Sequence, residues 1–372
     1  MKIAIISHKT SNLIRSRGKL IETLIVRGHK VIAICNEDTN KDKVEELGAT
    51  YRNATFDRTS INIFQNLKYL RTLDKILKEE QADAVLMYTI KPIIFGSIIA
   101  KKNNIKRIYS LITGMGYNYS SDKIRVKFIK LFCDYGYKKA LKYNTKVIFQ
   151  NREDMDELIR KKYIKKEQAV LVDGSGVDMN IFKQKENILH DKFTFLMVSR
   201  IIDVKGVLEY CKAAEIIKRK YPNTRFIHLG ENDNTYRGIK EKLIKKYKVN
   251  NIVEFKGRVK NVAEYMEKSN VVVLPSYLRE GIPRVLQEAL AVGRPIITTN
   301  TRGCKETIVN GKNGYLIEPK NVEQLIVAME KMLHKTSEEI HSMSELSYKI
   351  ATQRFDVEII NKKMIKILEE NF

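Results

Sequence analysis

The sequence predicts an α/β protein made of two doubly wound domains, each with a parallel sheet between layers of helices. Two observations predict this fold. Short apolar segments alternate with amphipathic segments along most of the chain, and this alternation stops once near the middle and then starts again. The length of 372 residues agrees with two domains of roughly 180 residues each.

The first series contains short apolar segments that are typical of buried strands. They lie at residues 2–6, 30–35, 84–88, 107–111, 146–150 and 169–172. Between the first two, apolar residues recur with the spacing of an amphipathic helix. These residues are Leu13, Ile14, Leu20, Ile21, Leu24 and Ile25. Repeated strand–helix units with right-handed crossovers predict a parallel sheet that helices cover on both faces.

A polar stretch without periodicity at residues 183–192 predicts a linker. A second series of strands follows, at residues 193–199, 224–229, 252–255, 271–274, 295–298 and 314–317. From about residue 322 the pattern is helical only. We therefore expect an N-terminal domain over residues 1–182, a C-terminal domain over 183–345 and C-terminal helices over 346–372, which could pack back on the N-terminal domain. A ligand is expected in a cleft between the domains, at the carboxyl ends of the strands.

The composition narrows the function classes. The formal net charge is +24, and residues 101–150 alone carry 12 Lys+Arg against 2 Asp+Glu. Such a charge attracts nucleic acid, anionic lipid or phosphorylated substrates, although coding bias toward lysine would also produce it. The four cysteines form no C-x-x-C pair, which indicates intracellular thiols. No apolar run approaches the roughly 20 residues of a membrane-spanning helix, so we expect a cytoplasmic protein.

The most informative segment follows the expected strand at residues 271–274 and includes EGIPRVLQEALAVGRP over residues 280–295. Pro283 is expected at the first position of a helix, whose free amides would form an anion site. Glu280 and Glu288 are suited to accept hydrogen bonds from sugar hydroxyls. The purely structural alternative is an Arg284–Glu288 pair within the helix, worth about 0.3–0.5 kcal/mol.

Two glutamates in the setting E-G-I-P-x-V-x-x-E-A-x-A-x-G-x-P resemble the signature of the family-4 retaining glycosyltransferases. These enzymes have two Rossmann-like domains that face each other across a cleft, the GT-B architecture. The resemblance implies that Glu280 orients the transferred sugar as a catalytic residue and that Glu288 binds the ribose hydroxyls. It also implies that Gly281, Ile282 and Pro283 contact the donor.

Further motifs of this family occur in the expected order. Arg200 and Lys205 follow the strand at residues 193–199, and they resemble the turn that grips the donor diphosphate. Fixed cations are most effective there because the leaving nucleoside diphosphate gains charge in the transition state. Gly230 and Val259 follow the next two strands and match the loops around the donor base and diphosphate.

The N-terminal half resembles the family mainly by architecture. It lacks the Gly-Gly pair that many members carry after the first strand, and it lacks the histidine that many carry after the strand at residues 107–111. In place of the histidine it has T-G-x-G-Y, which resembles a subgroup that builds bacterial capsule and O-antigen. This subgroup generally adds a sugar, often an N-acetylhexosamine, to a polyprenyl-diphosphate-linked acceptor. Thr113, Gly114 and Gly116 are therefore expected at the acceptor, together with Arg15 and Arg17 on the first helix.

The resemblance implies no metal and no cofactor, with a nucleotide sugar, expected to be UDP-linked, as co-substrate. Asp154 and Asp156 have D-x-D spacing but are expected in a first helical turn. With no obvious nucleophile, we expect a front-face mechanism. A nucleotide-sugar epimerase is the first alternative, but the six histidines are scattered. A nucleic-acid-binding protein is the second, and the aromatic fraction of 8% without tryptophan disfavours it.

Residues 122–143 form an expected basic helix with several apolar residues on one side. These are Ile124, Phe128, Leu131, Phe132 and Tyr135. This side either packs against the protein or docks on anionic lipid. The expected partners are thus a nucleotide sugar, a lipid-linked or other glycan acceptor and an anionic membrane surface, but no nucleic acid. The expected location is peripheral, on the inner face of the cell membrane.

Overall fold

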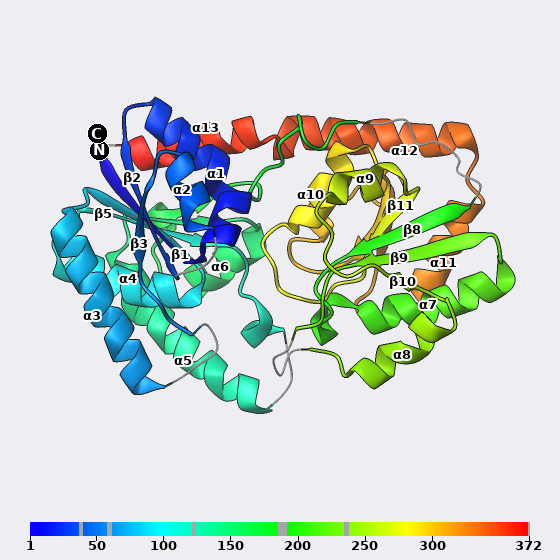
Figure 1. Ribbon diagram of the computed structural model, residues 1–372, viewed down its shortest axis with the longest axis horizontal. Coiled ribbons are helices and arrows are strands. Elements are labelled where there is room, and N and C mark those ends of the chain that lie inside the picture. Colours follow the sequence, from blue (N-terminus) through cyan, green and yellow to red (C-terminus); the bar gives the residue numbers. More distant parts are fainter. Residues whose placement is uncertain (37–39, 58–61, 121–123, 185–191, 234–237, 371–372) are drawn as a thin grey trace. The chain divides into compact units, whose positions relative to one another are not determined.

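The computed structural model describes residues 1–36, 40–57, 62–120, 124–184, 192–233 and 238–370 (Figure 1). The chain divides into two compact units. Unit 1 comprises the described residues of Met1–Asn118, Asp122–Ser175 and Val357–Phe372, and unit 2 comprises those of Tyr119–Ser121 and Gly176–Asp356. The polypeptide therefore passes into unit 2 at Gly176 and returns to unit 1 at Val357.

Unit 1 contains a parallel sheet of seven strands within its described residues. The strands are β1 Lys2–Lys9, β2 Lys30–Asn36, β3 Thr50–Asn53, β4 Ala84–Tyr88, β5 Arg107–Ile112, β6 Lys146–Phe149 and β7 Ala169–Leu171. Their order across the sheet is β3-β2-β1-β4-β5-β6-β7. Ile5 of β1 lies opposite Ala33 of β2 and Leu86 of β4, and all three side chains are fully buried. The order reverses between β1 and β4, which is where doubly wound sheets bind ligands.

The helices of unit 1 cover both faces of this sheet. They are α1 Thr10–Val26, α2 Lys41–Glu46, α3 Ile63–Glu80, α4 Ile90–Lys102, α5 Ile124–Ala140, α6 Arg152–Arg160 and α13 Val357–Glu369. Because right-handed crossovers change face where the strand order reverses, α1 and α2 lie on one face and α3, α4 and α5 on the other (Figure 1). On the second face, α4 packs against both α3 and α5.

Six of these strands were predicted, but β3 was missed. Its sequence, T-Y-R-N, has no apolar run, and only Tyr51 is partly buried. β3 lies at the edge of the sheet and pairs with β2 alone. An edge strand needs no continuous apolar sequence, since one side faces solvent. A search for apolar segments therefore cannot find it.

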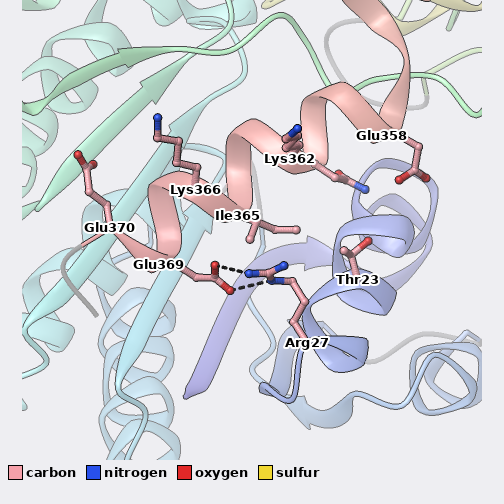
Figure 2. A pocket seen from close by; sticks show the side chains of 9 residues that line it. Thr23, Arg27, Glu358, Lys362, Ile365, Lys366, Glu369 and Glu370 are labelled. Atoms are coloured by element: carbon pink, nitrogen blue, oxygen red, sulfur yellow. Dashed lines mark hydrogen bonds and ion pairs between the residues drawn. The ribbon is translucent and has the colours of Figure 1, made fainter.

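The C-terminal helix α13 is part of unit 1. Its residues Ile360, Met364 and Leu368 are buried in the core of that unit. Glu369 accepts two hydrogen bonds from Arg27, the residue that follows α1, at 2.9 and 2.8 Å, and lies 2.9 Å from Nε2 of His29. Figure 2 shows this ion pair at one end of a groove of about 720 Å³ between α1 and α13. The C-terminal helix α13 is thus attached to the first strand–helix unit of the chain, β1 and α1.

The Glu369 pair predicts a pH-dependent attachment of α13. The hydrogen bonds from Arg27, and then that of His29, lower the pKa of Glu369 from 4.5 to about 2. Because the folded state has the lower pKa, the stabilisation is complete above pH 4.5 and is lost as the pH falls toward 2. We expect Glu369→Gln to speed hydrogen exchange in α13 at pH 7, with a smaller difference at pH 3. Glu370→Gln is the matched control, and an equal effect of both variants would contradict the prediction.

Unit 2 contains a second parallel sheet, of six strands within the described residues. They are β8 Phe193–Val198, β9 Thr224–Leu229, β10 Glu254–Phe255, β11 Val271–Leu274, β12 Ile296–Thr299 and β13 Gly314–Ile317. Their order is β10-β9-β8-β11-β12-β13. All six were predicted, with bounds that differ by no more than two residues. The central strands β8 and β11 pair directly, with Phe195 opposite Val271.

The helices of unit 2 are α7 Val207–Lys220, α8 Glu241–Val249, α9 Val262–Glu267, α10 Arg284–Ala291, α11 Val322–Leu333 and α12 Ser337–Ile350. A π-helical turn at Ala351–Phe355 follows α12 and leads to α13. The helical end of the chain was predicted. Val177 and Phe182, which come before the expected linker, are buried in the core of unit 2.

Candidate active site

The carboxyl edge of the unit 2 sheet brings together the charged and glycine motifs of the second half of the chain. All six strands are parallel, so the loops that follow them emerge at one edge. β8 and β11 are neighbours, and their loops carry Lys205 and Glu280. The loop after β9 carries Gly230 and Asp233 beside them. Residues up to 75 positions apart in the sequence therefore share one surface.

Lys205 and Glu280 form the centre of this edge. Nζ of Lys205 lies 2.5 Å from Oε1 of Glu280, and the hydroxyl of Ser276 donates to the same oxygen at 3.2 Å. The side chains of Lys205 and Glu280 are 11% and 19% exposed. A charge-assisted pair that is largely withdrawn from water is stronger than a surface pair. Two of the residues expected at the donor, a cation and a carboxylate, thus lie in direct contact.

The backbone holds this pair in position. The amide of Tyr277 donates to the carbonyl of Val204 at 2.9 Å, which joins the loop after β11 to the turn after β8. Gly206 ends that turn with φ +76, and a Cβ there would lie 2.2 Å from the carbonyl oxygen of Pro275. Only glycine allows so close an approach. The Lys205-Gly206 motif is thus explained by packing as well as by charge.

A third loop, after β12, supports Glu280 from the other side. Thr299 and Thr301 both donate to the carbonyl oxygen of Ser276. Cys304 is fully buried, and its pKa is raised by burial and further by the negative charge of Glu280. Glu280 therefore lies on a braced loop rather than on a free one.

Arg200 reaches the same edge but has a different partner. Its Nη1 lies 2.8 Å from Oδ2 of Asp233, and its side chain is 48% exposed. Asp233 was not predicted as a site residue, although it stands at the end of G-E-N-D directly after a predicted strand. In the part of the chain that the structure describes, Arg200 forms its ion pair with Asp233 and not with either glutamate. The four charged residues expected at the donor thus take part in three separate ion pairs.

Glu288 lies in α10 and is 1% exposed. Its Oε1 accepts a hydrogen bond from Nε of Arg284 at 2.8 Å, so the helical pair considered as a structural alternative does form. Pro283 precedes the first helical residue and is not the first itself, which corrects the predicted start by one position. The chain at Ile282 is fixed by Gln287, whose side-chain amide donates to the Ile282 carbonyl at 2.9 Å.

The loops after β9 and β10, which were expected near the donor, also touch. The amide of Gly230 donates to the carbonyl of Gly257 at 2.7 Å, and Val259 packs partly buried against the core of unit 2. His228, at the end of β9, is buried, and burial lowers its pKa to about 4. Its Nε2 lies 3.3 Å from the hydroxyl of Ser199. A neutral imidazole therefore lies under the loop that carries Arg200.

The residues expected at the acceptor lie at the carboxyl edge of the unit 1 sheet. Thr113 is exposed directly after β5, and Gly114 and Gly116 follow it with positive φ. Arg15 is exposed on α1, whereas Arg17 is only 3% exposed. Because the charge of Arg17 acts on the hydroxyl of the buried Tyr88 of β4, the Arg17 side chain lies near Tyr88 inside the unit. These residues flank β1, β4 and β5, where the strand order reverses.

The residues in the described part of the chain form no cluster of three or more His, Cys, Asp or Glu that could hold a metal ion. Asp154 lies in the first turn of α6, as predicted, and Asp156 lies just beyond it. Among the same residues, no helix is both long enough and apolar enough to cross a membrane.

Comparison with known proteins gives matches over both halves. The family described as "Glycosyl transferases group 1" matches residues 178–350, and "Glycosyl transferase 4-like" matches residues 2–151. An N,N'-diacetylbacillosaminyl-diphospho-undecaprenol alpha-1,3-N-acetylgalactosaminyltransferase of Campylobacter jejuni is 27% identical over 87% of each chain. A UDP-Gal:alpha-D-GlcNAc-diphosphoundecaprenol alpha-1,3-galactosyltransferase of Escherichia coli is 28% identical over 73% of this chain and 71% of its own.

Solved structures agree on the fold. Sucrose-phosphate synthase of Thermosynechococcus elongatus has a TM-score of 0.81 at 18% identity, and covers 99% of this chain and 98% of its own. HepE of Anabaena, solved in complex with UDP, has a TM-score of 0.79 at 18% identity over 99% of each chain. These families and relatives are transferases, which favours this class over the epimerase and nucleic-acid-binding alternatives. The chain is therefore a glycosyltransferase of two-domain GT-B fold, with a glycosyl transferase 4-like domain in its N-terminal half and a group 1 domain in its C-terminal half.

Proposed function

We propose that this glycosyltransferase moves a hexose or N-acetylhexosamine from a UDP-sugar to a polyprenyl-diphosphate-linked acceptor, with retention at the anomeric carbon. The proposed setting is capsule or O-antigen synthesis at the inner, cytoplasmic face of a bacterial membrane. The names of the Campylobacter and Escherichia relatives support this acceptor class. The second of these names also supports UDP as the donor nucleotide.

The observation that carries the proposal is the Lys205–Glu280 pair at the carboxyl edge of the unit 2 sheet. Arg200 and Lys205 each have a carboxylate partner, Asp233 and Glu280. A donor diphosphate supplies the same charge and the same oxygen acceptors as these carboxylates. The diphosphate would take over the two cations, and Glu280 would then be available to accept hydrogen bonds from the sugar hydroxyls.

In the proposed mechanism, the bond between C1 of the sugar and the β-phosphate oxygen breaks as the acceptor hydroxyl attacks C1 from the same face. The acceptor proton passes to the leaving phosphate oxygen. Lys205 and Arg200 stabilise the charge that develops on the diphosphate, assisted by the free amides that begin α10. Glu288 would bind the ribose hydroxyls in exchange for its hydrogen bond with Arg284. No metal or cofactor takes part in this scheme, and a trapped covalent glycosyl-enzyme would contradict it.

The acceptor side rests on unit 1. Thr113 and the backbone at Gly114 and Gly116 would contact the acceptor sugar or its diphosphate at the carboxyl end of β5. Arg15 is exposed on α1 at the same edge and can supply a charge to the acceptor diphosphate. Arg17 is buried near Tyr88, so its contribution would be to fix α1 rather than to bind the acceptor directly.

A nucleotide-sugar panel tests this function. The purified chain is incubated with UDP-, GDP- and dTDP-sugars, each with and without a synthetic polyprenyl-diphosphate sugar and without added metal. We expect nucleotide release that depends on the lipid-linked acceptor and occurs with a UDP-sugar, and an α-linked product from an α-linked donor. Release that requires only a water-soluble acceptor would contradict the lipid-linked part of the proposal. Interconversion of the donor without an acceptor would contradict the transfer itself.

A further inference from the structure

Helix α5 carries a row of large apolar side chains on its outer surface. Phe128, Leu131, Phe132 and Tyr135 are 63%, 65%, 71% and 65% exposed. They are spaced by three and four residues, so they lie on one face of the helix. We call these four residues the α5 stripe. The interpretation in which this side packs against the protein is therefore wrong for all four of them.

The opposite face of α5 is the one that packs. Val126, Cys133 and Tyr137 are buried. Gly136 lies so close to α4 that a Cβ on it would be 2.6 Å from Cδ1 of Ile94. The helix therefore cannot turn its stripe inward without losing this contact. The stripe is a fixed property of the surface of unit 1.

A second exposed apolar group lies on the same face of the sheet. Ile63, Phe64 and Leu67 in the first turns of α3 are 71%, 83% and 44% exposed. Both α3 and α5 pack against α4 and begin at the carboxyl edge of the sheet (Figure 1). Lys91 at the start of α4 donates to Oδ1 of Asn66 in α3 at 3.0 Å. The two exposed groups thus flank one helix.

The stripe is accompanied by positive charge. Lys127, Lys138, Lys139 and Lys142 are exposed, and none of them forms an ion pair with a described residue. Nζ of Lys139 lies 5.5 Å from the centre of the Tyr135 ring. Aromatic and aliphatic side chains bordered by lysines are the composition of helices that lie in the interface of an anionic bilayer. The apolar stems of lysine side chains can also lie along the acyl boundary, with their ammonium groups in the headgroup layer.

We propose that the α5 stripe docks into the headgroup layer of an anionic phospholipid bilayer, with the start of α3 as a second contact. This proposal rests on the proposed function for its role, since a lipid-linked acceptor must be reached at a membrane. The positive charge around the α5 stripe favours an anionic bilayer over a second copy of the chain as its binding partner. A second copy of the chain in a two-fold contact would place these lysines against one another, whereas an anionic bilayer supplies the opposite charge.

The test is vesicle flotation of the full chain. Vesicles of phosphatidylcholine with phosphatidylglycerol are compared with pure phosphatidylcholine vesicles, and neither contains an acceptor. We expect the Phe128→Ser/Phe132→Ser variant to lose about tenfold or more of its partition into the anionic vesicles. Leu243→Ser/Val249→Ser on α8 is the matched control, because these two side chains are also exposed, at 45% and 65%. It is expected to partition like the wild type.

A charge variant tests whether the lysines beside the α5 stripe contribute to binding of anionic lipid. Lys138→Gln/Lys139→Gln is expected to reduce partition by about fivefold for each lysine, and only on anionic vesicles. Lys242→Gln/Lys245→Gln on α8 removes the same charge from exposed positions elsewhere and is expected to have less than half of this effect on a logarithmic scale. Unchanged melting temperatures will show that all four variants fold.

The outcomes separate the two proposals. Partition that is the same for the wild type and both α5 variants would overturn the docking proposal, whatever the chain transfers. A wild-type dimer in sedimentation equilibrium that Phe128→Ser/Phe132→Ser dissociates would overturn it too, because the stripe would then cover a second copy. Vesicle binding as expected, combined with no transfer to a lipid-linked acceptor, would contradict the proposed function alone.

Discussion

Replacement of Lys205 by alanine is expected to lower kcat by on the order of 10³-fold, which is the loss that removal of one fixed transition-state donor or cation typically causes. The side chain of Lys205 is 11% exposed and pairs with Glu280 at 2.5 Å, so little water can enter to compensate for the lost cation. Glu280→Gln is expected to cause a comparable loss, because it keeps the shape but weakens the acceptor for both Lys205 and the sugar hydroxyls. Steady-state kinetics with a saturating donor measure both effects.

The control for Lys205→Ala is Lys335→Ala. Lys335 also pairs with a glutamate at 2.5 Å, but its partner Glu339 is 46% exposed on α12. This variant is expected to keep kcat within about twofold, since exposed pairs contribute little. The double variant Lys205→Ala/Glu280→Gln should lose less than the product of the single losses, because the two groups act as a unit. Strictly multiplicative losses would show that they act independently.

Replacement of Gly303 by alanine is expected to destabilise unit 2 by about 3 kcal/mol and to reduce activity in the protein that still folds. Gly303 has φ +81, and a Cβ on it would lie 1.4 Å from the carbonyl oxygen of Gly281, the residue after Glu280. The loop of Glu280 would have to move away from Lys205. A displacement of this kind typically costs about 10²-fold in rate. Denaturant unfolding and kcat/KM measure the two effects.

Gly311 separates strain from contact in this experiment. It has φ +78, close to that of Gly303, but no atom lies within 4 Å of the place where its Cβ would stand. Gly311→Ala should therefore cost only the backbone strain, about 1 kcal/mol, and leave kcat/KM unchanged. If both variants lost the same stability and activity, the contact between Gly303 and the Glu280 loop would have no functional role.

The two parallel sheets could be predicted from the sequence because strands that are buried on both faces consist of continuous apolar segments. All six strands of unit 2 and six of unit 1 were found this way. β3 was missed because an edge strand needs no such run. Parallel strands also explain why the loops of Lys205 and Glu280 lie at one edge of the sheet, although the direct contact between the two side chains was not predicted.

Other features depend on side-chain geometry that no pattern of residues specifies. Asp233 as the partner of Arg200 requires the position of the loop after β9. The exposure of Phe132 on α5 depends on which side of that helix faces α4, and the amphipathic pattern left open whether the apolar side packs or is exposed. Residue spacing alone likewise could not show whether Arg17 is exposed at the acceptor or buried near Tyr88, as the structure has it.

The central claim is that Lys205 and Glu280 exchange their mutual contact for contacts with a nucleotide sugar. A crystal structure of the chain with a bound UDP-sugar tests it most directly. The account predicts that Nζ of Lys205 lies about 2.7–2.9 Å from a diphosphate oxygen and that Glu280 accepts a hydrogen bond from the sugar. A nucleotide sugar whose diphosphate lies away from Lys205 and Arg200, with the Lys205–Glu280 pair still closed, would contradict it.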